Sequence, residues 1–179
     1  LADVSGATLS LNNLNQTISA LSGGGANGGN VMLGSGNLTI TGDGGSHAAV
    51  ISGSGSVIRD GAGTQVLAGA NLYSGGTVIS NGTLAIANPV GSGTGSGSVT
   101  VETNGTFQIG DGTQSGNVTA GFVTNNGVVR FNAANDISFS SVIVGDGVVD
   151  KEGVNVVTLP VANFSAGGIA TPSDAALVL

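Results

Sequence analysis

The chain has 179 residues, of which 34 are glycine and none is cysteine, and its ten acidic and three basic side chains give a formal net charge of −7. This charge argues against binding to nucleic acid or to anionic membranes, and the absence of cysteine excludes disulfides and thiolate metal sites. Apolar residues nevertheless make up 40% of the chain. Because most of them are Val, Ile, Leu and Ala set between turn-forming glycines, we predict an all-β protein.

The beginning of the chain suggests a piece of a longer protein. It starts with Leu1-Ala2-Asp3, without Met or a signal peptide. No apolar run approaches the roughly 18 residues of a membrane helix. We therefore expect residues 1–179 to be one segment of a longer chain. Its first strand is expected at residues 8–11, where Leu9 and Leu11 alternate with polar residues.

Five Asn-Gly or Asp-Gly dipeptides recur at intervals of 20 to 23 residues. Both dipeptides tolerate positive φ, so we expect each of them to form a tight turn. They are Asp60-Gly61, Asn81-Gly82, Asn104-Gly105, Asn126-Gly127 and Asp146-Gly147.

A strand pattern follows three of these turns, at residues 83–86, 106–109 and 128–131. The second and fourth residues of each are apolar, and a period of two places them on one face. A valine also stands three residues before each Asn of these turns, at Val78, Val101 and Val123. The expected inward pairs are Leu84 and Ile86, Phe107 and Ile109, and Val129 and Phe131.

Two architectures are compatible with this period. The dipeptides could close hairpins of an antiparallel sandwich, or each unit could be one coil of a parallel β-helix. Glycines in the middle of the units, such as Gly75-Gly76 and Gly91-Ser92-Gly93, favour a coil with several corners. A β-helix with about 20 residues per coil predicts eight or nine coils, stacked about 4.8 Å apart into a rod about 40 Å long.

A longer internal repeat relates residues 50–76 to residues 142–168 at a constant offset of 92. The identical pairs include Val57 with Val149, and Arg59 corresponds to Lys151. We interpret this match as an internal duplication that spans several coils.

A motif of about thirty ordered positions lies at residues 53–84. It consists of a Gly-x-Gly start, a basic residue, and then glycine, Asn, aromatic and Thr positions: Gly53-Ser54-Gly55, Arg59, Gly61-Ala62-Gly63-Thr64, Leu67-Ala68-Gly69-Ala70-Asn71, Tyr73, Gly75-Gly76-Thr77 and Gly82-Thr83-Leu84. This order resembles the autotransporter passenger-associated repeat, in which Lys is more usual at the position of Arg59.

The resemblance implies a right-handed parallel β-helix. It also implies a protein exported by type V secretion to the bacterial cell surface, or released from it, with a separate C-terminal translocator barrel as its first partner. It suggests a role of the repeat in folding and export of the passenger. Passengers differ in activity, so the resemblance does not specify one.

A catalytic triad would need His47, the single histidine, together with Asp43 and a serine such as Ser54. Ser54 lies in the glycine-rich repeat and lacks the strand-turn-helix setting of a nucleophile elbow. We therefore interpret it as part of a corner.

Carboxylates could instead serve a polysaccharide hydrolase or lyase. The charged cluster is formed by Asp146, Asp150, Lys151 and Glu152. Because Lys151 and Glu152 correspond to Arg59 and Asp60 in the internal repeat, we interpret them as a solvated edge of the scaffold.

Three Gly-Asp-Gly triplets invite a calcium hypothesis, at Asp43, Asp111 and Asp146. They are isolated and lack the tandem nonapeptides of repeat calcium sites, so ordinary turns explain them better. We predict no catalytic, cofactor-binding or metal-binding residue and no cofactor.

Two functions follow. The first is a non-catalytic stalk that assists passenger folding and export and displays other modules. The second is an adhesin segment that binds host glycans, extracellular matrix or neighbouring bacterial passengers. Exposed strand edges at the two coil ends also predict self-association through those ends.

Overall fold

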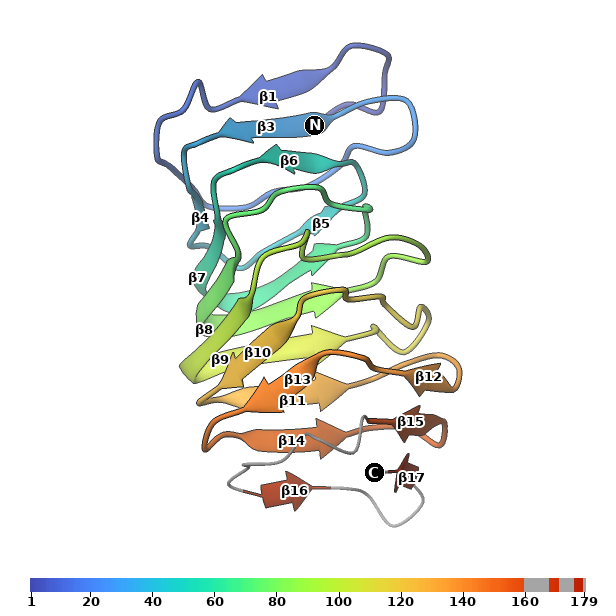
Figure 1. The fold of residues 1–179 in the computed structure, drawn as a ribbon. Helices are drawn as coiled ribbons and strands as arrows, with labels where there is room; N and C mark the ends of the chain where they lie inside the picture. The colour runs from blue at the N-terminus through green and yellow to red at the C-terminus, as the bar shows by residue number, and fades with distance from the viewer. Residues whose placement is uncertain (160–167, 171–175, 179) are drawn as a thin grey trace.

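The computed structural model describes residues 1–159, 168–170 and 176–178, and within them the chain winds into a solenoid of stacked coils (Figure 1). Every pairing between its strands is parallel. The described residues contain no helix, and therefore none long and apolar enough to span a membrane. The predicted all-β parallel solenoid is thus confirmed over an antiparallel sandwich, whereas its right-handed winding stays a prediction.

The strands form three sheets. A short sheet near the N-terminus contains β1 (Thr8–Ser10), β3 (Asn30–Gly34) and β6 (Ile51–Gly53), and another near the C-terminus contains β12 (Ile137–Ser138), β15 (Val156–Thr158) and β17 (Ala176–Val178). The long sheet runs β2 (Gln16–Ile18), β4 (Leu38–Ile40), β7 (Val57–Leu67), β8 (Thr77–Ile86), β9 (Val99–Ile109), β11 (Val128–Phe131), β14 (Val148–Lys151) and β16 (Gly168–Ala170). Attached to it are β5 (Ser46–His47), β10 (Phe122–Asn125) and β13 (Val142–Val144).

The long sheet gives the number of coils. Its main path crosses eight strands, and each crossing advances the sequence by about 20 residues, as from Val57 to Thr77 and from Thr77 to Val99. Strands β7, β8 and β9 bend midway, so each of them contributes to two faces of its coil (Figure 1). Eight coils agree with the predicted eight or nine.

The interior of the solenoid is a stack of apolar side chains. Leu84, Phe107 and Val129 lie in register on successive strands, and all three are fully buried. The second stack, Ile86, Ile109 and Phe131, is equally buried, so all six predicted inward residues are confirmed. Burial of such side chains supplies most of the stabilising free energy.

The prediction of tight turns at the five dipeptides was wrong. Among their glycines only Gly82 has a positive φ, of 68°, and Gly61 and Gly105 lie inside β7 and β9 at the bends. Glycine is needed there because the stacked coils touch. A Cβ on Gly82 would lie 1.9 Å from the carbonyl oxygen of Gly61, and one on Gly147 would lie 2.5 Å from that of Gly127.

The fixed spacing of the three valines was also misleading. Val101 and Val123 are fully buried, whereas Val78 is half-buried and faces outward. The register between β8 and β9 shifts between Ile79 and Asn81. This irregularity changes the number of residues at the corner, so equal distances from the glycine do not give equal faces.

The internal duplication stays a prediction, because its second copy extends into residues 160–167, which lie outside the described residues. When the strand registers are followed from coil to coil, Val57 is aligned with Ile143, and Gln65 is aligned with Val149. The pair Val57 and Val149, matched in sequence, therefore occupies different faces of the solenoid.

Candidate functional site

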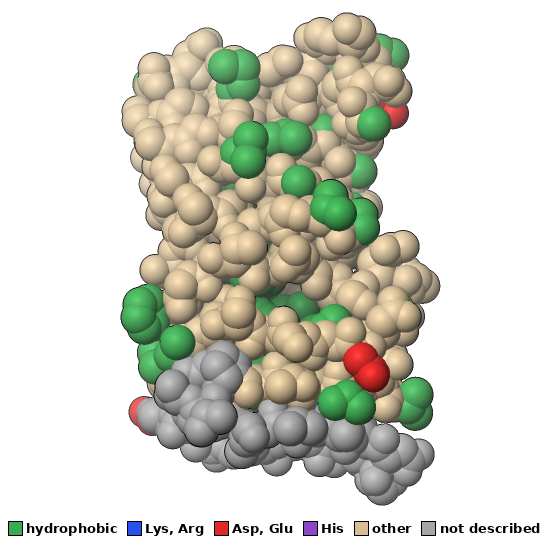
Figure 2. All heavy atoms as spheres, turned by 45° about the vertical axis from the view of Figure 1, so that its right-hand side comes forward, with side chains coloured by type: hydrophobic (Ala, Val, Ile, Leu, Met, Phe, Trp, Pro, Cys, Tyr) green, Lys and Arg blue, Asp and Glu red, His purple; other side chains and the backbone are tan. Residues whose placement is uncertain are grey.

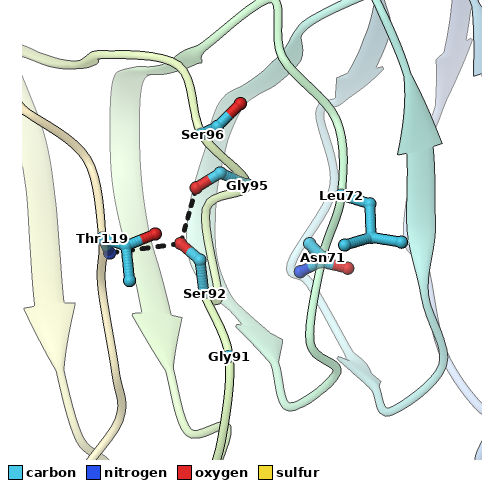
Figure 3. A pocket seen from close by; sticks show the side chains of 7 residues that line it. All are labelled: Asn71, Leu72, Gly91, Ser92, Gly95, Ser96 and Thr119. Carbon is cyan, nitrogen blue, oxygen red and sulfur yellow. Dashed lines mark hydrogen bonds between the residues drawn. The ribbon is translucent and has the colours of Figure 1, made fainter.

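An open groove of about 310 Å³ lies where three successive loops pass over one another. The loops are residues 68–76, 87–98 and 110–121, which follow β7, β8 and β9. Figure 3 shows the lining residues, which are Asn71, Leu72, Gly91, Ser92, Gly95, Ser96 and Thr119.

Asn71 forms a rigid wall of this groove. Its Oδ1 accepts a hydrogen bond of 2.8 Å from the backbone N–H of Ile51, and its Nδ2 donates one of 2.7 Å to the carbonyl oxygen of Gly93. The side chain is buried and joins three coils. Asn71 therefore holds the loops in place, and its amide is already occupied.

Ser92 is similarly occupied. Its hydroxyl donates a hydrogen bond of 2.6 Å to the carbonyl oxygen of Gly95 and accepts one of 3.2 Å from the backbone N–H of Thr119 (Figure 3). No residue of the groove lining is a base that could take its proton. Ser92 consequently shapes the loops and has no arrangement for nucleophilic catalysis.

The accessible part of the groove is neutral. Leu72 is 70% exposed, and Ser96 and Thr119 are exposed beside it. The lining contains no charged or titratable side chain. Figure 2 shows a face with few acidic side chains and no Lys or Arg in view among the described residues. Such a surface suits weak contact with an uncharged, partly polar ligand.

His47 is buried inside the solenoid on β5, with no exposed surface. Burial lowers the pKa of His47 from its usual 6.5 and outweighs the opposing effect of the nearby Gly23 backbone. Asp43 and Ser54 are exposed, and no ion pair joins Asp43 to His47 in the described part of the chain. The structure does not bring the triad candidates together.

The interpretation of Lys151 as a solvated edge residue was wrong. Lys151 is fully buried and its Nζ donates hydrogen bonds to the carbonyl oxygens of Glu152 and Gly153. Arg59 is also fully buried. In both cases the cation is buried and donates hydrogen bonds to backbone carbonyl oxygens at a corner of the coil.

The remaining charges of the predicted cluster form a surface ion-pair group. The Nε of Arg130 lies 2.9 Å from Asp150 and 3.1 Å from Glu152, whereas Asp146 is exposed at a corner and makes no ion pair among the described residues. Two carboxylates that share one guanidinium are a salt-bridge network. The geometry offers no separate acid and base for glycoside hydrolysis.

Asp111 explains one of the Gly-Asp-Gly triplets. Its Oδ1 accepts hydrogen bonds from the backbone N–H groups of Thr113 and Gln114 and from the hydroxyl of Thr113, at 2.7 to 2.8 Å. Partial burial alone would raise the pKa of Asp111, but these hydrogen bonds outweigh it and lower the pKa. The carboxylate thus caps its own turn. In the described part of the chain, no three His, Asp or Glu side chains gather as metal ligands.

No sequence pattern indicates the groove, because its residues come from three loops that share no motif. The buried cations could have been found, since each follows an apolar residue at an inward spacing: Val57 precedes Arg59 by two residues, and Val149 precedes Lys151 by two. Because alternate residues of a strand point to the same face, each cation lies on the same inward face as the valine two residues before it.

Comparison with known proteins identifies part of the chain. Residues 57–86 match the model of the Passenger-associated-transport-repeat. This range runs from the first residue of β7 to the last residue of β8, so the repeat is one complete coil step. The resemblance noted at residues 53–84 is confirmed.

A longer similarity points the same way. Over 88 residues, 47% of the chain, the sequence is 44% identical to the "Adhesin BmaC autotransporter" of Brucella suis biovar 1 (strain 1330). The match spans 3% of the length of that protein. No solved structure matches the chain.

Proposed function

We propose that residues 1–179 are a non-catalytic stalk segment of a secreted bacterial autotransporter passenger, which assists passenger folding and export and displays other modules at the cell surface. The observation that carries this proposal is the passenger repeat at residues 57–86, which spans β7 and β8 and so forms one step of the solenoid. The partner in export is the C-terminal translocator barrel of the same protein.

The structure supports a scaffold in two ways. The apolar stack runs through successive coils, as from Leu84 to Val129, so each coil stabilises the next. The candidate catalytic groups are dispersed, with His47 buried and with Asp150 and Glu152 paired with Arg130.

Surface display tests the stalk role. In a passenger joined to its translocator barrel, Leu84→Asp places a charge in the core of the repeat, whereas Thr83→Asp changes its half-buried outer neighbour. We expect Leu84→Asp to reduce the protease-accessible passenger on intact cells and Thr83→Asp to leave it near wild type. Normal display of a Leu84→Asp passenger whose purified chain is unfolded would contradict the proposal.

The second candidate function is adhesion to host glycans, extracellular matrix or neighbouring passengers, which the similarity to an adhesin favours. The neutral groove beside Leu72 is the surface for it. The purified chain on an array of glycans and matrix proteins tests this function. Binding that is lost in Leu72→Asp and kept in Leu14→Asp, which changes an exposed leucine elsewhere, would support adhesion through the groove. If the array gives no signal, adhesion is contradicted and the stalk role is the function that stands.

A further inference from the structure

His47 is a titratable side chain packed inside the solenoid. It lies in β5, aligned with Gly23 of the preceding coil and with Leu67 of β7 in the next. From Leu67 the same inward column continues through three apolar, fully buried residues, which are Ile86, Ile109 and Phe131. His47 has no exposed surface either, so a group that can take up a proton occupies a core position.

The ring of His47 is enclosed and has no acceptor for an added proton. Neither ring nitrogen makes a hydrogen bond within the part of the chain that the structure describes. A Cβ on Gly24 would lie 3.1 Å from Cε1 of His47, so the preceding coil packs directly against the ring. A neutral imidazole fits this place, whereas an imidazolium would lack the hydrogen bonds that a buried charge requires.

The charges of the neighbouring segments do not offset a positive ring. Burial lowers the pKa of His47 most, the backbone of Gly23 favours the charged form, and the amino group of Leu1 disfavours it. In the next coil, the inward neighbours Gln65 and Leu67 carry no charge.

The charged side chains nearby have other partners. Asp3 accepts hydrogen bonds from the backbone N–H groups of Asn27 and Gly28. Asp43 is exposed, and its charge favours the charged form of Arg59. None of these groups forms an ion pair with His47 among the described residues.

A buried hydrogen-bonded link lies directly beside this column. The Nε2 of Gln65 donates a hydrogen bond of 2.8 Å to the carbonyl oxygen of Leu21, and its Oε1 accepts one of 3.3 Å from the backbone N–H of Leu21. Leu21 and Gln65 stand two residues before Gly23 and Leu67, so they are the next inward positions along their strands. Water can replace both hydrogen bonds when the coils part.

Strand length changes at the same place. Each of the strands β1 to β6 contains two to five residues, whereas β7, β8 and β9 contain 10 or 11. The pairing of His47 with the preceding coil is a single bridge to Gly23. The coils before β7 are therefore held by shorter ladders and open at a lower free energy than the coils that follow.

We infer that His47 makes residues 1–53, the coils before β7, an acid-opened unit of the solenoid. Uptake of a proton by His47 separates this unit from β7, while the coils formed by β7 to β11 stay closed. Water then solvates the imidazolium, and Gln65 and Leu21 exchange their mutual hydrogen bonds for bonds to water. The opening reverses when the pH rises, because the neutral ring returns to its place.

Hydrogen exchange of the purified chain, measured by mass spectrometry and corrected for the intrinsic rate at each pH, tests this inference. A state that exposes His47 gains population as the pH falls below about 6.5, by at most about tenfold for each pH unit, until the folded pKa is reached. Between pH 7.5 and 5.5 we expect the protection of β1 to β4 to fall by about threefold to tenfold. The protection of β8 to β11 should change by less than about twofold, because opening of the first coils leaves their ladders intact.

Two variants remove the titration at this position, the apolar His47→Leu and the polar His47→Asn. We expect the protection of β1 to β4 to be the same at both pH values in each variant that folds. Protection of β1 to β4 that does not fall in the wild type, or that falls equally in the variants, would overturn the inference. An equal fall in β8 to β11 would also overturn it, because the solenoid would then open as one unit. None of these results bears on surface display, which tests the passenger role separately.

Discussion

The guanidinium of Arg59 donates a hydrogen bond of 2.7 Å from Nη2 to the carbonyl oxygen of Gly63, four residues later in the same strand. Its Nη1 reaches the carbonyl oxygen of Ile40 in the preceding coil, at 3.2 Å. The register between β7 and β8 shifts at this corner, between Asp60 and Thr64. A buried cation therefore fills this corner and hydrogen-bonds to carbonyl oxygens of two successive coils.

Replacement of Arg59 should therefore destabilise the chain. Arg59→Met keeps much of the volume but removes the two hydrogen bonds to the carbonyl oxygens of Ile40 and Gly63, and a hydrogen bond to a charged group contributes about 1.5–3 kcal/mol. Urea unfolding measures the loss. Arg130→Met is the control, since Arg130 is partly exposed and its ion pairs contribute at most about 1 kcal/mol. Equal losses in the two variants would show that the corner carbonyls do not depend on Arg59.

The apolar stack predicts a contrast between neighbours on β9. Phe107 is fully buried, so Phe107→Ala should cost about 3–5 kcal/mol. Gln108 faces outward and donates one hydrogen bond to the carbonyl oxygen of Gly110, so Gln108→Ala should cost at most about 1 kcal/mol. Thermal unfolding with matching midpoints for the two variants would refute the stacked core.

The close approach of some glycines to the neighbouring coil predicts a contrast between two Gly→Ala changes. A Cβ on Gly105 would lie 2.2 Å from the carbonyl oxygen of Ile79, while one on Gly121 would meet nothing within 4 Å. Neither glycine has a positive φ, so the comparison isolates the close approach of the coils. We expect Gly105→Ala to lower the unfolding midpoint strongly and Gly121→Ala to leave it unchanged or slightly raised. A tolerated Gly105→Ala would mean that the coils can separate at this corner.

His47 predicts a dependence of stability on pH. Its pKa is below 6.5 in the folded chain, so the unfolded chain takes up the proton more readily. Stability is then fully present above the unfolded pKa and is lost as the pH falls through it toward the folded pKa. Urea midpoints at pH 7.5 and 5.5 should differ in the wild type and differ less in His47→Leu. The same pH dependence in both would place the titrating group elsewhere.

Chelation tests the calcium hypothesis. Asp111 already accepts hydrogen bonds from its own turn, so we expect EDTA to leave the thermal midpoint unchanged. A fall of several degrees would indicate a bound cation at a Gly-Asp-Gly turn.

The coil period and the inward stack could be predicted because alternation of apolar and polar residues has one physical cause, burial of one face of a strand. Leu84 and Phe131 follow that rule without exception. The role of the repeated glycines could not be predicted, because their requirement comes from a neighbouring coil about 20 residues away. Gly147 is needed because of Gly127, and its own dipeptide contains no sign of that contact.

The candidate site was less predictable for a similar reason. The acids beside Lys151 suggested a surface residue, although its spacing of two from Val149 indicates the inward face, where the structure places it. The groove beside Leu72 depends on how three loops stack, which no single segment encodes.

The pairing of each strand with the strand of the next coil also decides how far along the chain a contact must reach. Val57 meets Thr77, and Thr77 meets Val99, so a new coil closes as soon as slightly more than twenty residues follow the last one. Because each closure spans a similar number of residues, its loop-closure entropy stays nearly the same from one coil to the next. A polypeptide threaded through a narrow pore from one end could therefore add coils one at a time on the far side, and each added coil would make backward sliding more costly.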